Sequence, residues 1–241
     1  MMRRLEETLP ALRRRYRWAA DLVLETVLAP SCPVCATPFD EHLSGVCRFC
    51  WEEVSHLSER TGWIVRRGMS GRILDSMTAL GPYEGTLRRI VHRLKFGDMQ
   101  ALAEPLGGML ARAVGPGSPG DLVVPVPLHW SRRLRRGYNQ SLAMAAALAH
   151  DSGRELAPGL IRRRRPTAPQ TGRSRRERAA NVKGAFRGGS SLGGATVILV
   201  DDVVTTGATI IECARVLRRA GAGSVHAAVA ARTVSQTNTW R

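Results

Sequence analysis

VILVDDVVTTGAT, residues 197–209, is the stretch that decides the fold class of this chain. Residues 197–200 form a β-branched apolar run with the length and composition of a fully buried parallel strand. The run ends at two adjacent carboxylates, Asp201 and Asp202, and from Ala208 onward apolar residues recur at helical spacing. The stretch therefore predicts a strand, an acidic pair, a short polar loop and a helix, which together make one unit of an α/β sheet.

The loop between this strand and helix has the chemistry of an anion cradle. Its residues are Thr205, Thr206, Gly207, Ala208 and Thr209. The first turn of a helix leaves backbone N–H groups unpaired, its dipole favours negative charge, and a glycine lets the backbone approach a phosphate closely. The two carboxylates can accept hydrogen bonds from vicinal hydroxyls or help to hold hydrated Mg²⁺, which favours a sugar phosphate over a simple anion. An ordinary αβ unit with a capping aspartate pair is the alternative.

Four cysteines near the N-terminus have the spacing of a structural zinc site. Cys32 and Cys35 form one CxxC pair, and Cys47 and Cys50 form another after eleven intervening residues. Two such turns can bring four thiolates to the corners of a tetrahedron and close the coordination sphere of Zn²⁺, whereas disulfides are the alternative. We therefore predict a small zinc-ribbon-like module at residues 31–60, stabilised mostly by its metal.

The net charge of +16 is concentrated in one part of the chain. Residues 131–187 contain fifteen Lys or Arg against three acidic residues. Such an excess indicates affinity for a polyanion, whether nucleic acid, a diphosphate substrate or an acidic partner, although a solvated arginine-rich surface gives the same charge. A signal peptide and a membrane-spanning apolar run are both absent from the sequence, so we expect a cytoplasmic protein with no membrane contact.

Two basic segments precede the acidic pair along the chain. The first follows a predicted strand at residues 121–127, and the second, residues 160–187, has little apolar periodicity and is expected to be mobile until a ligand binds. Guanidinium groups suit a diphosphate, although any single arginine can equally belong to a solvated face. The arginines that we select as candidates for binding a diphosphate are Arg132, Arg133, Arg136 and Arg173.

The chain divides into three predicted parts. Residues 1–30 contain an amphipathic helix that we expect to pack on the next part, which is the cysteine module. Residues 54–76 carry no informative pattern, and residues 77–235 form the α/β domain. Within that domain, Cys213 falls on the apolar side of the helix after the cradle and is predicted to be a core residue.

The motifs taken in order resemble those of the competence protein F (ComF) family of phosphoribosyltransferase-like proteins. They are the paired CxxC turns, LKFGD, VPVPL, RGYNQ and VDDVVTTGAT. The resemblance implies a type I phosphoribosyltransferase fold, which is a parallel sheet flanked by helices, preceded by a small zinc-binding module. It also implies binding of phosphoribosyl pyrophosphate (PRPP) with Mg²⁺, in which Asp201 and Asp202 hold the ribose hydroxyls and residues 205–209 hold the 5′-phosphate.

Two functions follow as hypotheses. The first is enzymatic transfer of a phosphoribosyl group from PRPP to an unknown nitrogen acceptor, in a protein associated with DNA uptake and natural transformation. The second is a non-catalytic competence accessory protein that binds single-stranded DNA or a helicase partner through its basic face and zinc module. The acceptor, the occurrence of turnover and self-association into a homo-oligomer stay open at this point.

Overall fold

The computed structural model describes residues 31–38, 45–61, 66–67, 73–97, 99–115, 120–128, 137–164 and 175–233. Two sets of predictions lie outside these residues. One is the amphipathic helix within residues 1–30, and the other is the set of arginines selected as diphosphate candidates.

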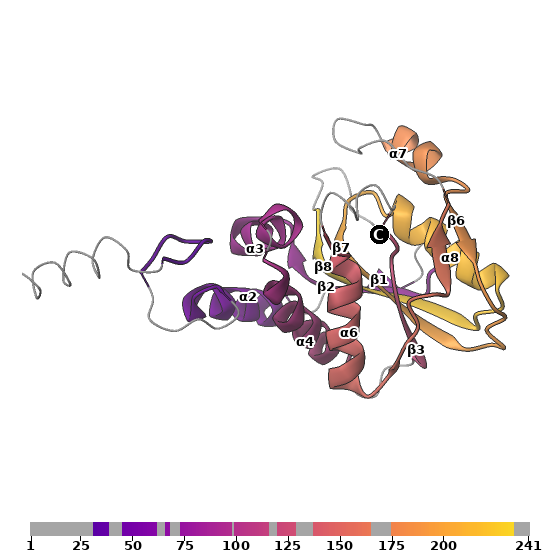
Figure 1. Cartoon of the computed structure of the whole chain (residues 1–241), viewed down its shortest axis with the longest axis horizontal. Coiled ribbons are helices and arrows are strands. Elements are labelled where there is room, and N and C mark those ends of the chain that lie inside the picture. The colour runs from indigo at the N-terminus through magenta and orange to yellow at the C-terminus, as the bar shows by residue number, and fades with distance from the viewer. Residues whose placement is uncertain are drawn as a thin grey trace, which may run out of the picture.

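A six-stranded sheet lies at the centre of the molecule (Figure 1). Its strands are, in spatial order, β1 (Arg66–Arg67), β2 (Ser76–Pro82), β8 (Ser224–Arg232), β7 (Thr196–Val204), β3 (Leu122–Pro125) and β4 (Glu155–Leu156). Neighbouring strands pair in parallel, except that β1 pairs with β2 in antiparallel fashion. The predicted parallel sheet is confirmed.

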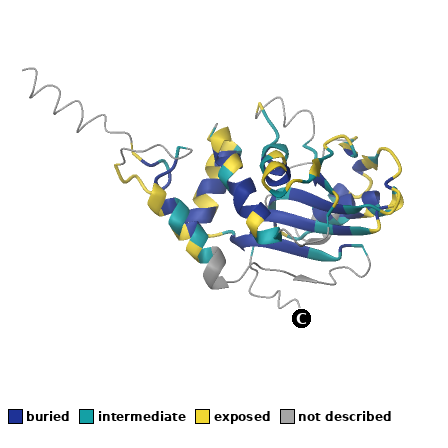
Figure 2. Ribbon diagram, turned by 90° about the horizontal axis from the view of Figure 1, so that it is seen from below, coloured by how far each residue is buried: buried dark blue, intermediate teal, exposed yellow. Residues whose placement is uncertain are grey.

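Helices cover both faces of this sheet. They are α3 (Gly85–Phe96), α4 (Ala103–Val114, after the 3₁₀ turn Gln100–Leu102) and α6 (Gln140–Ser152) on one face and α8 (Ala208–Arg219) on the other (Figure 1). Alternate residues of β7 serve the two faces, because Ile198 and Val200 pack with α3, α4 and α6, whereas Val197 and Leu199 pack with α8. Figure 2 shows the strands buried between these layers. The predicted fold, a parallel sheet flanked by helices, is confirmed.

The cysteine segment packs directly on the α/β domain. Helix α2 (Arg48–Thr61) begins inside the second CxxC turn and contains Cys50, and Val54 belongs to the same apolar core as Leu80 and Leu87. No helix is predicted within residues 54–76, although Cys50, Val54 and Leu57 are spaced to cover one face of a helix. Charged residues surround this narrow apolar stripe, which explains why the helix is not evident from the sequence.

No helix in the described part of the chain is long and apolar enough to cross a membrane.

The basic segment 160–187 is partly structured. Its two ends form an antiparallel ribbon from β5 (Ile161–Arg163) and β6 (Phe186–Gly188), preceded on the second side by α7 (Arg175–Val182). Buried side chains anchor this ribbon on α8, among them Ile161, Val182 and Phe186. The expectation of a mobile segment therefore needs correction at both ends, because a few apolar residues without periodicity are enough to dock it. Residues 165–174 lie outside the described residues.

Candidate functional site

The acidic pair lies inside strand β7 rather than just after it. We predicted a strand ending at Val200, whereas β7 continues through Asp201 and Asp202 to Val204. The extension forms because the last residues of β7 pair with β8 as far as Arg232. Both aspartates are thus held by a central strand near its carboxyl end, the edge of an open α/β sheet at which ligands bind.

Asp201 is partly buried and its carboxylate is hydrogen-bonded. The hydroxyl of Ser141, on α6, donates to Asp201 Oδ1 at 2.9 Å, and the backbone N–H of Asp202 donates to the same oxygen at 2.9 Å. Burial raises the pKa of Asp201 to about 7, the Asp202 carboxylate adds to this rise, and Lys95 and the Ser141 hydroxyl oppose it. This carboxyl group therefore changes its protonation near neutral pH.

Asp202 forms an ion pair with Lys95, a residue of the LKFGD motif for which the sequence predicts no role. Lys95 Nζ lies 3.0 Å from Asp202 Oδ1, and the two side chains are only 17% and 13% exposed. Lys95 sits in the last turn of α3, and its Nζ is 6.0 Å from the centroid of the Tyr83 ring. The backbone N–H of Val203 also donates to Asp202 Oδ1, at 2.6 Å. A positive side chain is therefore part of the site.

The loop after β7 has the form of the predicted cradle. Gly207 adopts the left-handed conformation, with φ of +76°, and stands at the N-terminus of α8, which begins at Ala208 as predicted. The carbonyl of Gly207 accepts the N–H of Ile211, and Thr206 Oγ1 accepts the N–H of Ala208 at 3.5 Å. A small open hollow lies over this turn, lined by Asp201, Val203, Val204, Thr205, Thr206, Gly207, Ala208, Thr209 and Ile210. Asp201 and the helix N-terminus thus share one hollow, and Asp202 lies beside Asp201 in the strand.

The RGYNQ motif holds the helices that supply the partners of the acidic pair. The hydroxyl of Tyr138 donates to the carbonyl of Leu94 in α3. Asn139 caps α6 by accepting the N–H of Ser141 at 3.2 Å, and its amide donates to the carbonyl of Val126 at 3.3 Å. The motif therefore fixes the last turn of α3 and the first turn of α6 beside the end of β3.

The four diphosphate candidates are not placed by the described residues. The described residues on either side of the stretch 129–136 contact the site. Residues 120–128 include β3, which pairs with β7, and α6 places Ser141 on Asp201. A diphosphate role for these arginines stays a prediction.

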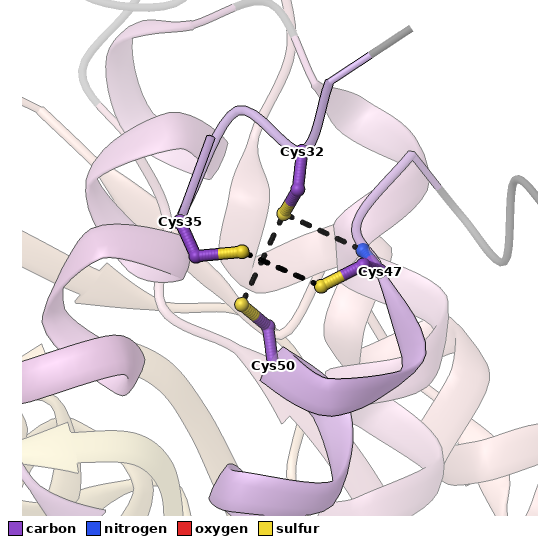
Figure 3. A group of neighbouring side chains, drawn as sticks. All are labelled: Cys32, Cys35, Cys47 and Cys50. Carbon is purple, nitrogen blue, oxygen red and sulfur yellow. Dashed lines mark hydrogen bonds between the residues drawn. The ribbon is translucent and has the colours of Figure 1, made fainter. Parts of the chain in front are cut away.

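The four cysteines form a second site, separate from the acidic pair (Figure 3). All four Sγ atoms lie within 4.8 Å of one another, with Cys32 to Cys50 at 3.9 Å and Cys35 to Cys47 at 3.6 Å. Tetrahedral zinc with Zn–S bonds of about 2.3 Å requires sulfur atoms about 3.8 Å apart. The backbone N–H groups of Val34 and Cys47 point at Cys32 Sγ, at 3.4 and 3.5 Å. The donor set and its spacing fit a zinc ion.

The chemistry of the thiols agrees with a metal site. Burial raises the pKa of Cys47 and of Cys50, whereas hydrogen bonds with Thr37 lower the pKa of the exposed Cys35 to about 6. A bound cation would supply the charge that stabilises the buried thiolates. All five cysteines are free in the structure, and the cluster's Sγ atoms, at 3.6 and 3.9 Å, are spaced for a metal rather than for a disulfide bond. The fifth, Cys213, is fully buried in the core as predicted.

Comparison with known proteins matches both halves of the molecule. Residues 103–241 match the phosphoribosyl transferase domain family. The DNA utilization protein YhgH of Salmonella typhi is 37% identical over 210 residues, which cover 84% of this chain and 90% of that protein. Competence protein F of Haemophilus influenzae is 29% identical over 184 residues, covering 73% and 79% respectively. The solved glutamine phosphoribosylpyrophosphate amidotransferase from B. subtilis has 24% identity and a TM-score of 0.39, covering 54% of this chain and 26% of that one.

Proposed function

We propose that the acidic pair and the cradle of this chain bind PRPP. The premise is its family: the chain belongs to the phosphoribosyl transferase domain family, among the DNA utilization and competence F proteins. One observation carries the proposal. Two adjacent carboxylates near the carboxyl end of a central parallel strand are followed within a few residues by a left-handed glycine and the start of a helix, and Asp201, Gly207 and the first residues of that helix line one hollow.

Each part of this site suits one part of PRPP. The N–H groups of the first turn of α8, with the hydroxyls of Thr205, Thr206 and Thr209, suit the 5′-phosphate. Asp201 and Asp202 are acceptors for the 2′- and 3′-hydroxyls of the ribose. Carboxylate oxygens are also the ligands that Mg²⁺ prefers, so the acidic pair fits Mg²⁺, which when bound would neutralise charge on the diphosphate.

The proposed reaction is a displacement at C1 of the ribose. A nitrogen lone pair forms the new C1–N bond, and the electron pair of the broken C1–O bond leaves with pyrophosphate. Because the transition state resembles an oxocarbenium ion, the protein's task is to position the ribose and to neutralise the leaving group. The aspartates do the first, and the basic segments carrying Arg132, Arg133, Arg136 and Arg173 are the candidates for the second.

Calorimetric titration of PRPP in the presence of Mg²⁺ tests the proposal. We expect one PRPP per chain, and a loss of affinity of at least about 100-fold in Asp201→Asn/Asp202→Asn, since hydrogen bonds to charged groups contribute about 1.5–3 kcal/mol each. Asp151→Asn is the matched control, because Asp151 is an exposed aspartate on α6 and should leave the affinity unchanged. Absence of PRPP binding by the unaltered protein would remove the proposal. Pyrophosphate release over a panel of nitrogen bases then decides whether the site turns over.

A second candidate function, binding of single-stranded DNA, is favoured by the outer face of α3. Arg88, Arg89, His92 and Arg93 are exposed there, and Phe96 is 61% exposed, with its ring centroid 4.9 Å from that of His92. Cationic side chains can follow a phosphate backbone, and exposed rings can stack on bases. The basic stretch 131–187 that first suggested a polyanion lies partly outside the described residues, so this face offers a sharper target.

Salt dependence separates this function from PRPP binding. Fluorescence anisotropy with a labelled oligonucleotide should show affinity falling steeply between about 50 and 200 mM salt, and Arg88→Ala should weaken binding and reduce the salt slope by roughly one. Arg219→Ala is the control, since Arg219 is an exposed arginine on α8, across the sheet from α3. Equal effects of the two substitutions would exclude the outer face of α3 as the binding surface.

A further inference from the structure

The ion pair between Lys95 and Asp202 places a positive charge directly beside the acidic pair. We propose that Lys95 is an internal counter-ion of the acidic pair, so that the site accepts a divalent cation only together with a sugar diphosphate. The inference rests on the proposed function for its ligand, and it gives Lys95 of the LKFGD motif a role, and metal binding a condition, that neither the motif itself nor the relatives assign.

The geometry makes Lys95 and a metal ion competitors. Lys95 Nζ is 3.0 Å from Asp202 Oδ1, an oxygen that already accepts the N–H of Val203 at 2.6 Å. The Oδ1 oxygen of Asp201 accepts from Ser141 and from the N–H of Asp202. Mg²⁺ would stand about 2.0–2.1 Å from a carboxylate oxygen, close to an ammonium group that repels it in a shielded setting. A free cation must therefore displace Lys95 before it can use this oxygen.

Charge balance favours the metal only when the diphosphate arrives with it. The free site holds two carboxylates and one ammonium: Lys95 is ion-paired with Asp202, and its charge also acts on Asp201. A metal–PRPP complex brings phosphate oxygens that offer the ammonium a new partner. The lysine can follow them, because its charge is carried on a flexible four-carbon stem.

Lys95 is held near the acidic pair by contacts of the two residues that precede it in α3. The carbonyl of Leu94 accepts the hydroxyl of Tyr138, and Arg93 Nε donates to the carbonyl of Pro33 in the first cysteine turn, at 3.1 Å. The backbone that carries Lys95 is thus fixed by the RGYNQ motif and by the cysteine module. An ammonium positioned in this way is a built part of the site rather than an incidental surface contact.

Electron paramagnetic resonance of Mn²⁺, used as a probe for Mg²⁺, tests the inference on the full-length, zinc-loaded chain. In the absence of PRPP, we expect the unaltered protein to bind no more Mn²⁺ than Asp201→Asn/Asp202→Asn does, which corrects for ions bound elsewhere. Lys95→Gln should bind one additional Mn²⁺ at least about tenfold more tightly than the unaltered protein, because the competing charge is gone. Lys95→Arg should restore the unaltered behaviour. Lys95→Met repeats the test with a purely apolar stem, and the thermal unfolding midpoint of each variant verifies folding.

The outcomes are distinguishable from those of the proposed function. Equal Mn²⁺ binding by the unaltered protein and by Lys95→Gln and Lys95→Met, without PRPP, would overturn the inference. Additional Mn²⁺ in the lysine variants that persists after Asp201→Asn/Asp202→Asn is introduced would also overturn it. Failure of PRPP to bind the unaltered protein would remove the proposed function, whereas the measurement with metal alone would still report whether Lys95 excludes a cation.

Discussion

The cysteine cluster and the acidic pair are assembled in opposite ways. Cys32 and Cys50, the outer members of the cluster, are 18 residues apart, and all four ligands come from two neighbouring turns. Asp201 instead receives its hydrogen bond from Ser141, 60 residues away, and Asp202 pairs with Lys95 from a third element. A site built from local spacing is visible in the sequence, whereas the charge environment of a site built from distant elements is visible only in the fold.

The two sites nevertheless share a helix. The first cysteine turn accepts a hydrogen bond from Arg93, and Glu53 of α2 accepts one from Thr86 at 2.7 Å, so both ends of α3 are tied to the cysteine module. The same helix carries Lys95 to the acidic pair. The cysteine cluster, here the closed site, therefore supports the acidic pair with its cradle, here the open site. Substitutions can separate what each site contributes.

The largest effect is expected from breaking the closed site. Cys50→Ser should reduce zinc from one per chain to near zero, because Cys50 is a buried member of the cluster and structural zinc contributes about 10–16 kcal/mol in isolated zinc-finger peptides. Metal analysis with a thermal unfolding scan measures both consequences. Cys213→Ala, which alters a buried cysteine outside the cluster, should keep full zinc content. Zinc retained by Cys50→Ser would contradict the four-cysteine site.

The next effect concerns the backbone of the open site. Gly207→Ala should weaken PRPP binding about 5- to 30-fold, since a residue with a Cβ atom costs about 1–2 kcal/mol in the left-handed conformation that Gly207 adopts. Calorimetry measures this loss. Gly159→Ala is the control, because Gly159 lies in open space and shows no positive φ. An unchanged affinity in Gly207→Ala would mean that the cradle does not hold the phosphate.

A pH effect should distinguish the open site from the closed one. Protonation of Asp201, whose pKa is raised from 3.8 to about 7, stabilises the folded state fully below about pH 4, and this contribution is lost as the pH rises through about 7. Affinity for Mg²⁺ and PRPP should change in the opposite sense, rising about tenfold per pH unit up to about pH 7 and then levelling, because the carboxylate is the binding form.

Calorimetry at a series of pH values measures this dependence. The phosphates of the ligand also titrate, so Asp201→Asn serves as the control that retains only the ligand's own pH dependence. A pH profile identical in the two proteins would show that Asp201 is not the titrating group.

The smallest effect is expected from Ser141. Ser141→Ala removes one hydrogen bond to the Asp201 carboxylate, which should lower PRPP affinity about fivefold and move the midpoint of the pH profile upward, since that bond favours the ionised form. Ser141→Thr keeps a hydroxyl and should restore both values. A midpoint that does not move would show that Ser141 serves only the packing of α6.

The sequence predicted the parts of the molecule whose pattern is local. The parallel strands, the start of α8 at Ala208 and the four clustered cysteines all follow from runs and spacings within a few tens of residues. The end of β7 was placed too early, because charged residues at 201 and 202 look like a strand end when the pairing with β8 is unknown. Lys95 stands in the LKFGD motif, but its role at the acidic pair could not be predicted, because a lysine in the last turn of a helix is ordinary on sequence grounds.

The central claim is that the turn from β7 into α8, with its acidic pair, is the PRPP site. Hydrogen–deuterium exchange of the zinc-loaded protein, with and without PRPP and Mg²⁺, tests it most directly. We predict slower exchange at the backbone amides of residues 205–210 when PRPP is present, and no change in the cysteine turns at residues 32–35 and 47–50. Protection confined to the cysteine turns or to α3, or no protection at saturating PRPP, would contradict the claim.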